Sequence, residues 1–95
     1  MMYLVTYSTV DKFISLRFLG AVKEHFKKWA ILSDNVCIVV SDETVVEVRE
    51  YLKSFIKKED KLLVTKISAP AAWNGYPKQM NDWLLQTYQK DKNDE

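Results

Sequence analysis

Alternating and continuous runs of apolar residues divide the chain into strand-like and helix-like segments. Residues 3–8 are mostly aromatic or β-branched, which is typical of a strand interior. Alternation along that strand separates two sets of side chains, Tyr3, Val5 and Tyr7 on one face and Leu4, Thr6 and Ser8 on the other. Both faces carry apolar groups, so the pattern indicates a strand covered on both sides.

Three more strands are predicted further along the chain. Residues 29–32 and 36–40 flank the turn-forming segment 33–35 and predict a β-hairpin. Every residue of 36–40 is apolar, which again favours a strand buried on both faces. Residues 61–67 predict the fourth strand.

Helical spacing of apolar residues predicts three helices. The first runs to about Lys27 after a cap at Thr9 or Asp11, and the second starts within 41–44 and runs to about Lys57. Gly20 lies inside the first helix at a cost of about 1 kcal/mol relative to Ala, either because another backbone approaches closely or for no packing reason. The third helix begins at Pro77. Its apolar stripe is Met80, Trp83, Leu84, Thr87 and Tyr88.

This order of elements, with right-handed crossovers, predicts a ferredoxin-like βαββαβ fold of the α+β class, in which two helices cover one face of a four-stranded antiparallel sheet. We expect a single domain over residues 1–89 and a frayed polar tail over 90–95. Apolar side chains on the second face of the sheet would then be exposed to water. Each exposed side chain would lose roughly 1.5–3 kcal/mol of stabilisation that burial provides. The C-terminal amphipathic helix or a second copy of the chain is expected to cover it.

Composition narrows the possible functions. The net charge of +1 gives no global attraction to nucleic acid or anionic lipid, so any such binding needs a local patch. Apolar runs are too short to span a bilayer, and we expect a cytoplasmic protein without membrane contact. Cys37 is the only cysteine and is interpreted as a small buried hydrophobe, because nothing in the pattern brings the only histidine, His25, towards it.

Four stretches, in order over nearly the whole chain, carry a family resemblance. They are Tyr3-Leu4-Val5-Thr6-Tyr7, the hairpin 29–41, Lys61-Leu62-Leu63-Val64, and the tail from Ala72-Trp73 to Trp83-Leu84. The sequence resembles the SinR-like branch of the superfamily that holds the small CRISPR-associated adaptation subunit and the VapD-type interferases. The resemblance implies a homodimer whose sheets meet. The residues expected at that interface are Leu4, Thr6, Ser8, Trp73 and Trp83.

In many members of that superfamily the first strand ends in an aspartate, and its two copies across the dimer bind a divalent metal for phosphodiester cleavage. This chain has Ser8 after Tyr7 at that place. Magnesium prefers anionic oxygen ligands, and a serine hydroxyl is a neutral, weak one. We therefore expect neither a metal cofactor nor metal nuclease activity. Asp11 is the candidate substitute in the alternative, a toxin-type endonuclease using magnesium, although a helix cap is its other interpretation.

Lysines lie at the C-terminal ends of the first two predicted helices. If these helices run parallel, Lys27, Lys28, Lys57 and Lys58 lie at one edge of the sheet and can contact phosphates without reading sequence. The other interpretation is that they are solubilising lysines that complement the helix dipoles. The tryptophans and tyrosines can likewise stack on bases or simply form core and interface.

The sequence thus favours a homodimer that binds nucleic acid or a protein partner and resembles the CRISPR-associated adaptation subunit. One alternative is the metal-dependent endonuclease, acting on RNA or DNA. A second alternative is an interaction module of phage or antiviral-defence origin, which captures a protein partner through its sheet edge or its C-terminal helix.

Overall fold

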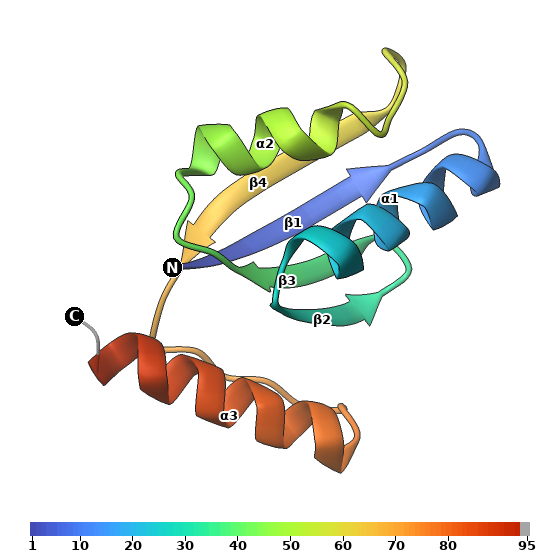
Figure 1. Ribbon diagram of the computed structural model, residues 1–95. Coiled ribbons are helices and arrows are strands. Elements are labelled where there is room, and N and C mark those ends of the chain that lie inside the picture. The colour runs from blue at the N-terminus through green and yellow to red at the C-terminus, as the bar shows by residue number, and fades with distance from the viewer. Residues whose placement is uncertain (94–95) are drawn as a thin grey trace.

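The computed structural model describes residues 1–93, and residues 94 and 95 lie outside the described part of the chain. The elements, in chain order, are β1 (Met2–Ser8), α1 (Lys12–His25), β2 (Lys28–Ser33), β3 (Val36–Val40), α2 (Val45–Lys53), β4 (Lys61–Ile67) and α3 (Lys78–Asn93) (Figure 1). The predicted order of elements is confirmed, and each strand agrees with its predicted bounds to within one residue.

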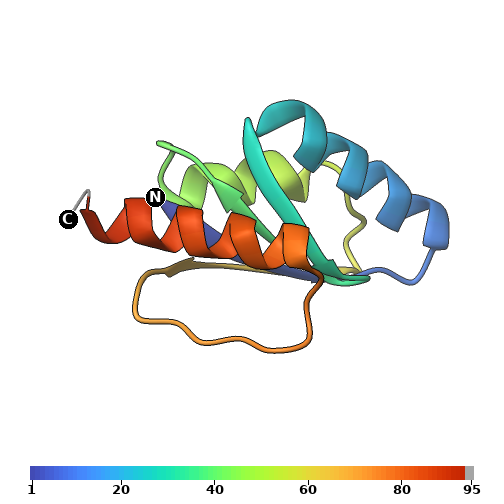
Figure 2. The same cartoon turned by 90° about the horizontal axis from the view of Figure 1, so that it is seen from below.

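The strands form one antiparallel sheet in the order β2-β3-β1-β4. At one end of β1, Met2 lies opposite Val40 of β3, and at the other end Ser8 lies opposite Lys61 of β4. Helices α1 and α2 lie on the same face of this sheet (Figure 2). The protein therefore has the ferredoxin-like α+β fold that the sequence predicts, because right-handed crossovers place both helices on one side.

The main core lies between the sheet and these two helices. Tyr3, Val5 and Tyr7 are buried there, as the alternation along β1 predicts. The other buried members of this core are Phe18, Val22, Phe26, Cys37, Val39, Val48 and Leu52. Ring contacts add to it, since the Tyr7 and Phe18 centroids are 4.3 Å apart.

Local hydrogen bonds set the ends of the helices. Asp11 is the cap of α1, and its Oδ1 accepts the backbone N–H of Phe13 at 2.9 Å. Thr44 begins α2 in a capping box with Glu47. α2 ends at Lys53, earlier than predicted, because the Ser54 hydroxyl donates to the Tyr51 carbonyl at 2.6 Å and the chain then continues in turns.

The two helices on the sheet run in opposite directions (Figure 1). α1 returns across the sheet after β1, and α2 returns after β3, which is antiparallel to β1. The prediction that the helices are parallel is therefore wrong. Their C-terminal ends lie at opposite ends of the sheet, and this separates the lysines that follow them.

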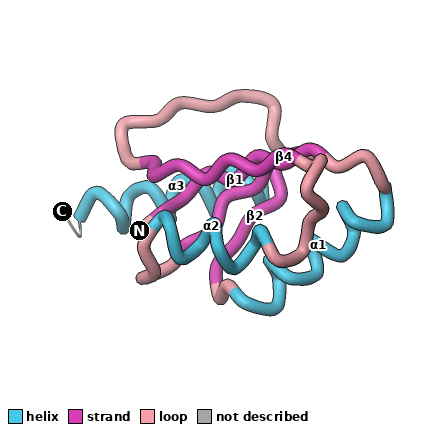
Figure 3. The backbone as a smooth tube through the Cα atoms, turned by 90° about the horizontal axis from the view of Figure 1, so that it is seen from above, coloured by secondary structure: helices cyan, strands magenta, loops and turns pink. Residues whose placement is uncertain are grey.

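The segment 68–77 and α3 fold onto each other at the C-terminal end of the described chain. The Trp73 indole N–H donates to Asn81 Oδ1 at 2.8 Å, and the ring stacks with Tyr88 at a centroid distance of 5.8 Å. Gly75 adopts a φ of 94°, a left-handed conformation that favours glycine where the chain turns back towards α3. Segment 68–77 lies on the opposite side of the strands from α1 and α2 (Figure 3).

The second face of the sheet, opposite α1 and α2, is only partly covered. Met2, Ala30 and Ile38 are buried on this face, and Leu84 of α3 is buried as well. Cavities of about 420 and 500 Å³ flank Trp83 between α3 and the sheet. Leu63 of β4 stays 58% exposed. α3 thus covers part of the apolar second face of the sheet and leaves the β4 side of that face open.

α3 extends further than the sequence indicates. It continues to Asn93, so residues 90–93 of the predicted frayed tail are helical in the structure. The remaining two residues of that predicted tail lie outside the described part of the chain. Within residues 1–93, no helix has the length and apolarity that a membrane span requires.

Candidate nucleic-acid interface

Positively charged side chains gather around one hollow at the C-terminal end of α2, which we call the basic cavity. It has a volume of about 530 Å³. Its charged lining residues are Arg49, Lys53, Lys57, Lys58 and Asp60, four cations and one carboxylate. Arg49 and Lys53 come from one side of α2 at a spacing of four residues, and the rest come from the connection 54–60 that leads into β4.

The single carboxylate of the basic cavity has a structural role. Asp60 Oδ1 accepts the backbone N–H of Val10 at 3.1 Å, and its Oδ2 accepts the backbone N–H of Lys57 at 2.8 Å. Both oxygens therefore hold the connection 54–60 in place against the loop after β1. Because these bonds orient the carboxylate towards backbone donors, the lysine ammonium groups stay available to a phosphate.

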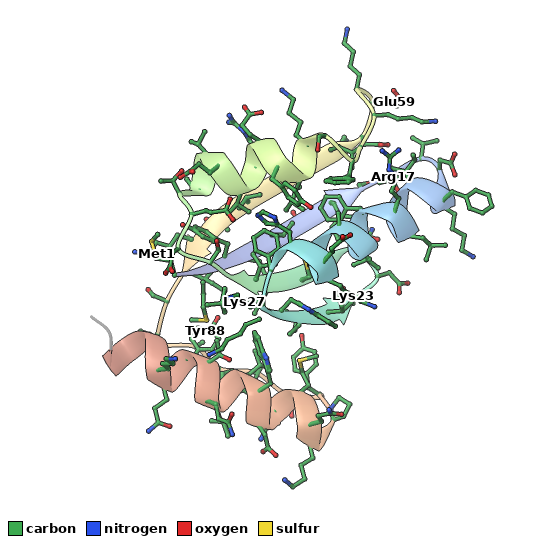
Figure 4. The ribbon with its side chains drawn as sticks, in the orientation of Figure 1. Met1, Arg17, Lys23, Lys27, Glu59 and Tyr88 are labelled. Atoms are coloured by element: carbon green, nitrogen blue, oxygen red, sulfur yellow. The ribbon has the colours of Figure 1, made fainter. Side chains whose placement is uncertain are left out.

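Two other carboxylates lie beside cations of this region. Glu50 Oε1 lies 2.8 Å from Arg49 Nη2, and Asp11 Oδ2 lies 3.9 Å from Lys57 Nζ. All four of these side chains are about half exposed, so water and salt screen the pairs and each contributes little. Figure 4 shows Arg17 and Glu59 at this same end of the molecule.

Lys27 and Lys28 lie at the other end of the sheet. Lys28 is opposite Val40, which is opposite Met2, whereas Ser8 at the far end of β1 is opposite Lys61. The length of β1 separates these two ends by about 20 Å. The structure therefore divides the predicted patch: Lys57 and Lys58 belong to the basic cavity, and Lys27 and Lys28 do not. The antiparallel course of α1 and α2 is the reason.

Ser8 and Asp11, the candidates for metal chemistry, lie near the basic cavity end. Ser8 is exposed at the end of β1, beside a hollow of about 340 Å³ lined also by Thr6, Lys61 and Leu63. Asp11 caps α1 with one oxygen and lies near Lys57 with the other. Among residues 1–93, no three His, Cys, Asp or Glu side chains are grouped so that they could hold a metal ion.

The five residues expected at a dimer interface occupy different environments. Leu4 and Thr6 are half-buried on the second face of the sheet, and Ser8 is exposed at its end. Trp73 and Trp83 are half-buried within their own chain, Trp73 against α3 and Trp83 between the two cavities under that helix. The open part of the second face therefore lies on the β4 side.

A histidine–carboxylate pair that the sequence did not indicate lies near the other end of the sheet. His25 Nε2 is 2.7 Å from Glu43 Oε1, and the imidazole stacks on the Tyr51 ring at 3.8 Å. The Tyr3 hydroxyl donates to the Glu43 carbonyl oxygen at 2.6 Å. The pair joins the end of α1 to the start of α2. Its residues are 18 positions apart on different elements, so no local pattern could reveal it.

Cys37 and Tyr7 are buried groups without a catalytic setting. Burial raises the pKa of the Cys37 thiol to about 12, so the thiol stays protonated and unreactive at neutral pH. Burial also raises the pKa of Tyr7 to about 12, and its hydroxyl donates to the Asp34 carbonyl oxygen at 2.9 Å. The interpretation of Cys37 as a buried hydrophobe is confirmed.

Comparison with known proteins establishes the fold alone. Neither a family model nor a curated protein matches the chain. Among solved structures, a hypothetical protein, TT1823, from Thermus thermophilus is similar with a TM-score of 0.62 and 17% sequence identity. The alignment covers 79% of this chain and 90% of that protein. The shared ferredoxin-like arrangement is thus present in an experimentally determined structure.

Proposed function

We propose that the protein binds nucleic acid through the basic cavity without reading its sequence. The observation that carries this proposal is the concentration of Arg49, Lys53, Lys57 and Lys58 around one hollow. Among the described residues that line it, the one carboxylate, that of Asp60, is bonded to backbone N–H groups. Long flexible ammonium side chains suit phosphate contacts, which position a nucleic acid but do not read bases. The resemblance to the CRISPR-associated adaptation subunit supports the same function.

The proposed activity is binding without metal-dependent cleavage. Ser8 stands where the resembling family has an aspartate, and Asp11 serves as the cap of α1. The toxin-type endonuclease would have to hold magnesium through Asp11 Oδ2, because Oδ1 caps α1, and Oδ2 lies 3.9 Å from the Lys57 ammonium group. The geometry therefore favours a binding protein over the nuclease.

The expected salt dependence follows from the number of cations. Each phosphate neutralised on a duplex contributes about −0.9 to the slope of log affinity against log salt concentration. Four contacts predict a slope of about −3 to −4, so the affinity falls roughly a hundredfold between about 50 and 200 mM salt. A slope near zero would show that the basic cavity does not bind phosphates.

Two charge-reversal variants test which end of the molecule binds. We expect Lys57→Glu with Lys58→Glu to weaken binding to short DNA or RNA duplexes by at least about tenfold and to lower the salt slope by about 2. The matched control, Lys27→Glu with Lys28→Glu, changes the net charge equally at the other end and should bind like the unmodified protein. Equal losses in both variants, measured by fluorescence anisotropy, would show that only overall charge matters.

We also propose that two copies associate through the open part of the second sheet face. Leu63 is 58% exposed there, next to half-buried Thr6 and Val36, and burying such a patch is favourable. Leu63→Asp should abolish association through this face, so that sedimentation velocity at micromolar concentration detects a smaller assembly than that of the unmodified protein. The control Leu85→Asp, on exposed α3 surface, should leave the assembly of the unmodified protein intact. An unmodified protein that sediments as a monomer would contradict this part of the proposal.

A further inference from the structure

Helix α1 carries an apolar stripe on its outer side, which we call the α1 stripe. Phe13 is 78% exposed and Leu16 is 62% exposed, and Val10, just before the helix, is 84% exposed. Phe13, Leu16 and Gly20 share one side of the helix because three and four residues make nearly one turn. Exposed large apolar groups in a contiguous stripe are unusual on a monomer and indicate an interaction surface.

Gly20 gives this stripe a specific shape. A Cβ built at Gly20 would have no atom of the described chain within 4 Å, and φ at this position is ordinary. The chain's own fold thus requires no glycine here, although glycine inside a helix is destabilising relative to Ala. What the glycine provides is a notch on the outer side of the helix, where a bulky group from another molecule can approach the backbone.

From this shape we infer that the α1 stripe binds the α1 stripe of a second copy in an antiparallel pair. If the two helices are related by a twofold axis beside Leu16, Phe13 of each copy lies opposite Gly20 of the other. Phe13 and Gly20 are two turns apart on each helix. The pair therefore contains two identical contacts, each between the Phe13 ring of one copy and the notch at Gly20 of the other. Such self-complementarity is what a twofold-symmetric contact requires.

Charges flanking the stripe agree with this arrangement. Glu24 lies one turn beyond Gly20, and Lys12 immediately precedes Phe13. In the antiparallel pair, Glu24 of one copy lies near the N-terminal end of the other helix, close to its Lys12. A carboxylate is favoured there by both the lysine and the positive end of the helix dipole. This surface lies on the helix side of the sheet and is separate from the second-face contact proposed above.

Cysteine pairs test the register of the contact directly. Phe13→Cys with Gly20→Cys should form a doubly disulfide-linked dimer on mild oxidation, because each cysteine faces the other position in the second copy. Residues 13 and 20 of one helix are about 10 Å apart along its axis, beyond the reach of an internal disulfide. Cys37 stays in place, since it is buried, and the unmodified protein under the same oxidant controls for it.

The matched control is Phe13→Cys with Glu24→Cys, which keeps both cysteines on the outer side of α1 but shifts the register by one turn. We expect it to form at least several-fold less linked dimer than the first pair. Repeating both oxidation experiments with Leu63→Asp added separates the α1 contact from the sheet contact. The disulfide linkage between residues 13 and 20 should persist in that background. Equal linkage in the two cysteine pairs, or none in either, overturns the inference.

A second variant separates association from folding. Gly20→Gln fills the notch but meets nothing in its own chain, so helix propensity should raise the melting temperature by about 4 °C. The same variant should weaken the α1-dependent association at least about tenfold, measured by sedimentation equilibrium with Leu63→Asp present. Association that is unchanged by Gly20→Gln would show that the glycine does not receive Phe13.

Discussion

Phe18→Ala is expected to lower the free energy of unfolding by about 3–5 kcal/mol. The Phe18 side chain is 0% exposed in α1 and its ring contacts Tyr7 of β1 at a centroid distance of 4.3 Å. Alanine would lose the transfer free energy of the ring and leave a cavity between helix and sheet. Since domains of this size are stable by only about 5–15 kcal/mol, the loss is a large share of the total.

The matched control for this change is Phe13→Ala in the same helix, where the ring is 78% exposed. Urea unfolding of a dilute sample, where self-association contributes least, should place Phe13→Ala within about 0.5 kcal/mol of the unmodified protein. If the two variants were destabilised equally, Phe18 and Phe13 could not face opposite sides of α1, and the placement of that helix on the sheet would be wrong.

Leu84→Ala is expected to cost about 2–3 kcal/mol and to detach α3 from the sheet. Leu84 is 3% exposed and is the residue of α3, among those described, whose side chain is fully buried. The expected cost is at the lower end for a buried leucine, because cavities on both sides of Trp83 let the helix settle after truncation. Detachment should expose Trp83 to water and shift its fluorescence to longer wavelength.

The neighbouring Leu85→Ala is the control, since Leu85 is 52% exposed on the same helix. It should change neither the unfolding midpoint nor the tryptophan emission. An identical response of both variants would mean that α3 does not rest on the sheet through the Leu84 side. Far-UV circular dichroism should lose part of its helical signal in Leu84→Ala, because a detached helix of 16 residues is only marginally stable in water, and should be unchanged in Leu85→Ala.

The strands and the starts of the helices could largely be predicted from local patterns. Alternation along β1 correctly assigned Tyr3, Val5 and Tyr7 to one face, because side chains of a strand point to opposite faces in turn. The apolar run 36–40 correctly indicated a strand, and Asp11 was correctly named as a possible cap. These features depend on neighbouring residues, so the sequence carries them directly.

The candidate site could be predicted only in part. Lys57 and Lys58 were identified from sequence, but Lys27 and Lys28 were grouped with them because the helices were taken as parallel. Arg49 and Lys53 lie on α2, and their convergence on the basic cavity depends on how the connection 54–60 folds back. That fold-back depends on Asp60 reaching the backbone of Val10, a contact across 50 positions.

The sequence by itself determined the order and type of the elements, the α+β class and the apolar character of both faces of the central strands. These follow from periodicity, capping and turn chemistry, which act over a few residues. Only the tertiary structure decided the separation of the lysines, the pairing of His25 with Glu43 and the exposure of both Phe13 and Gly20 on the outer side of α1. The physical reason is that each of these three features depends on the direction and packing of elements that are distant in sequence. Local sequence patterns are compatible with more than one such arrangement.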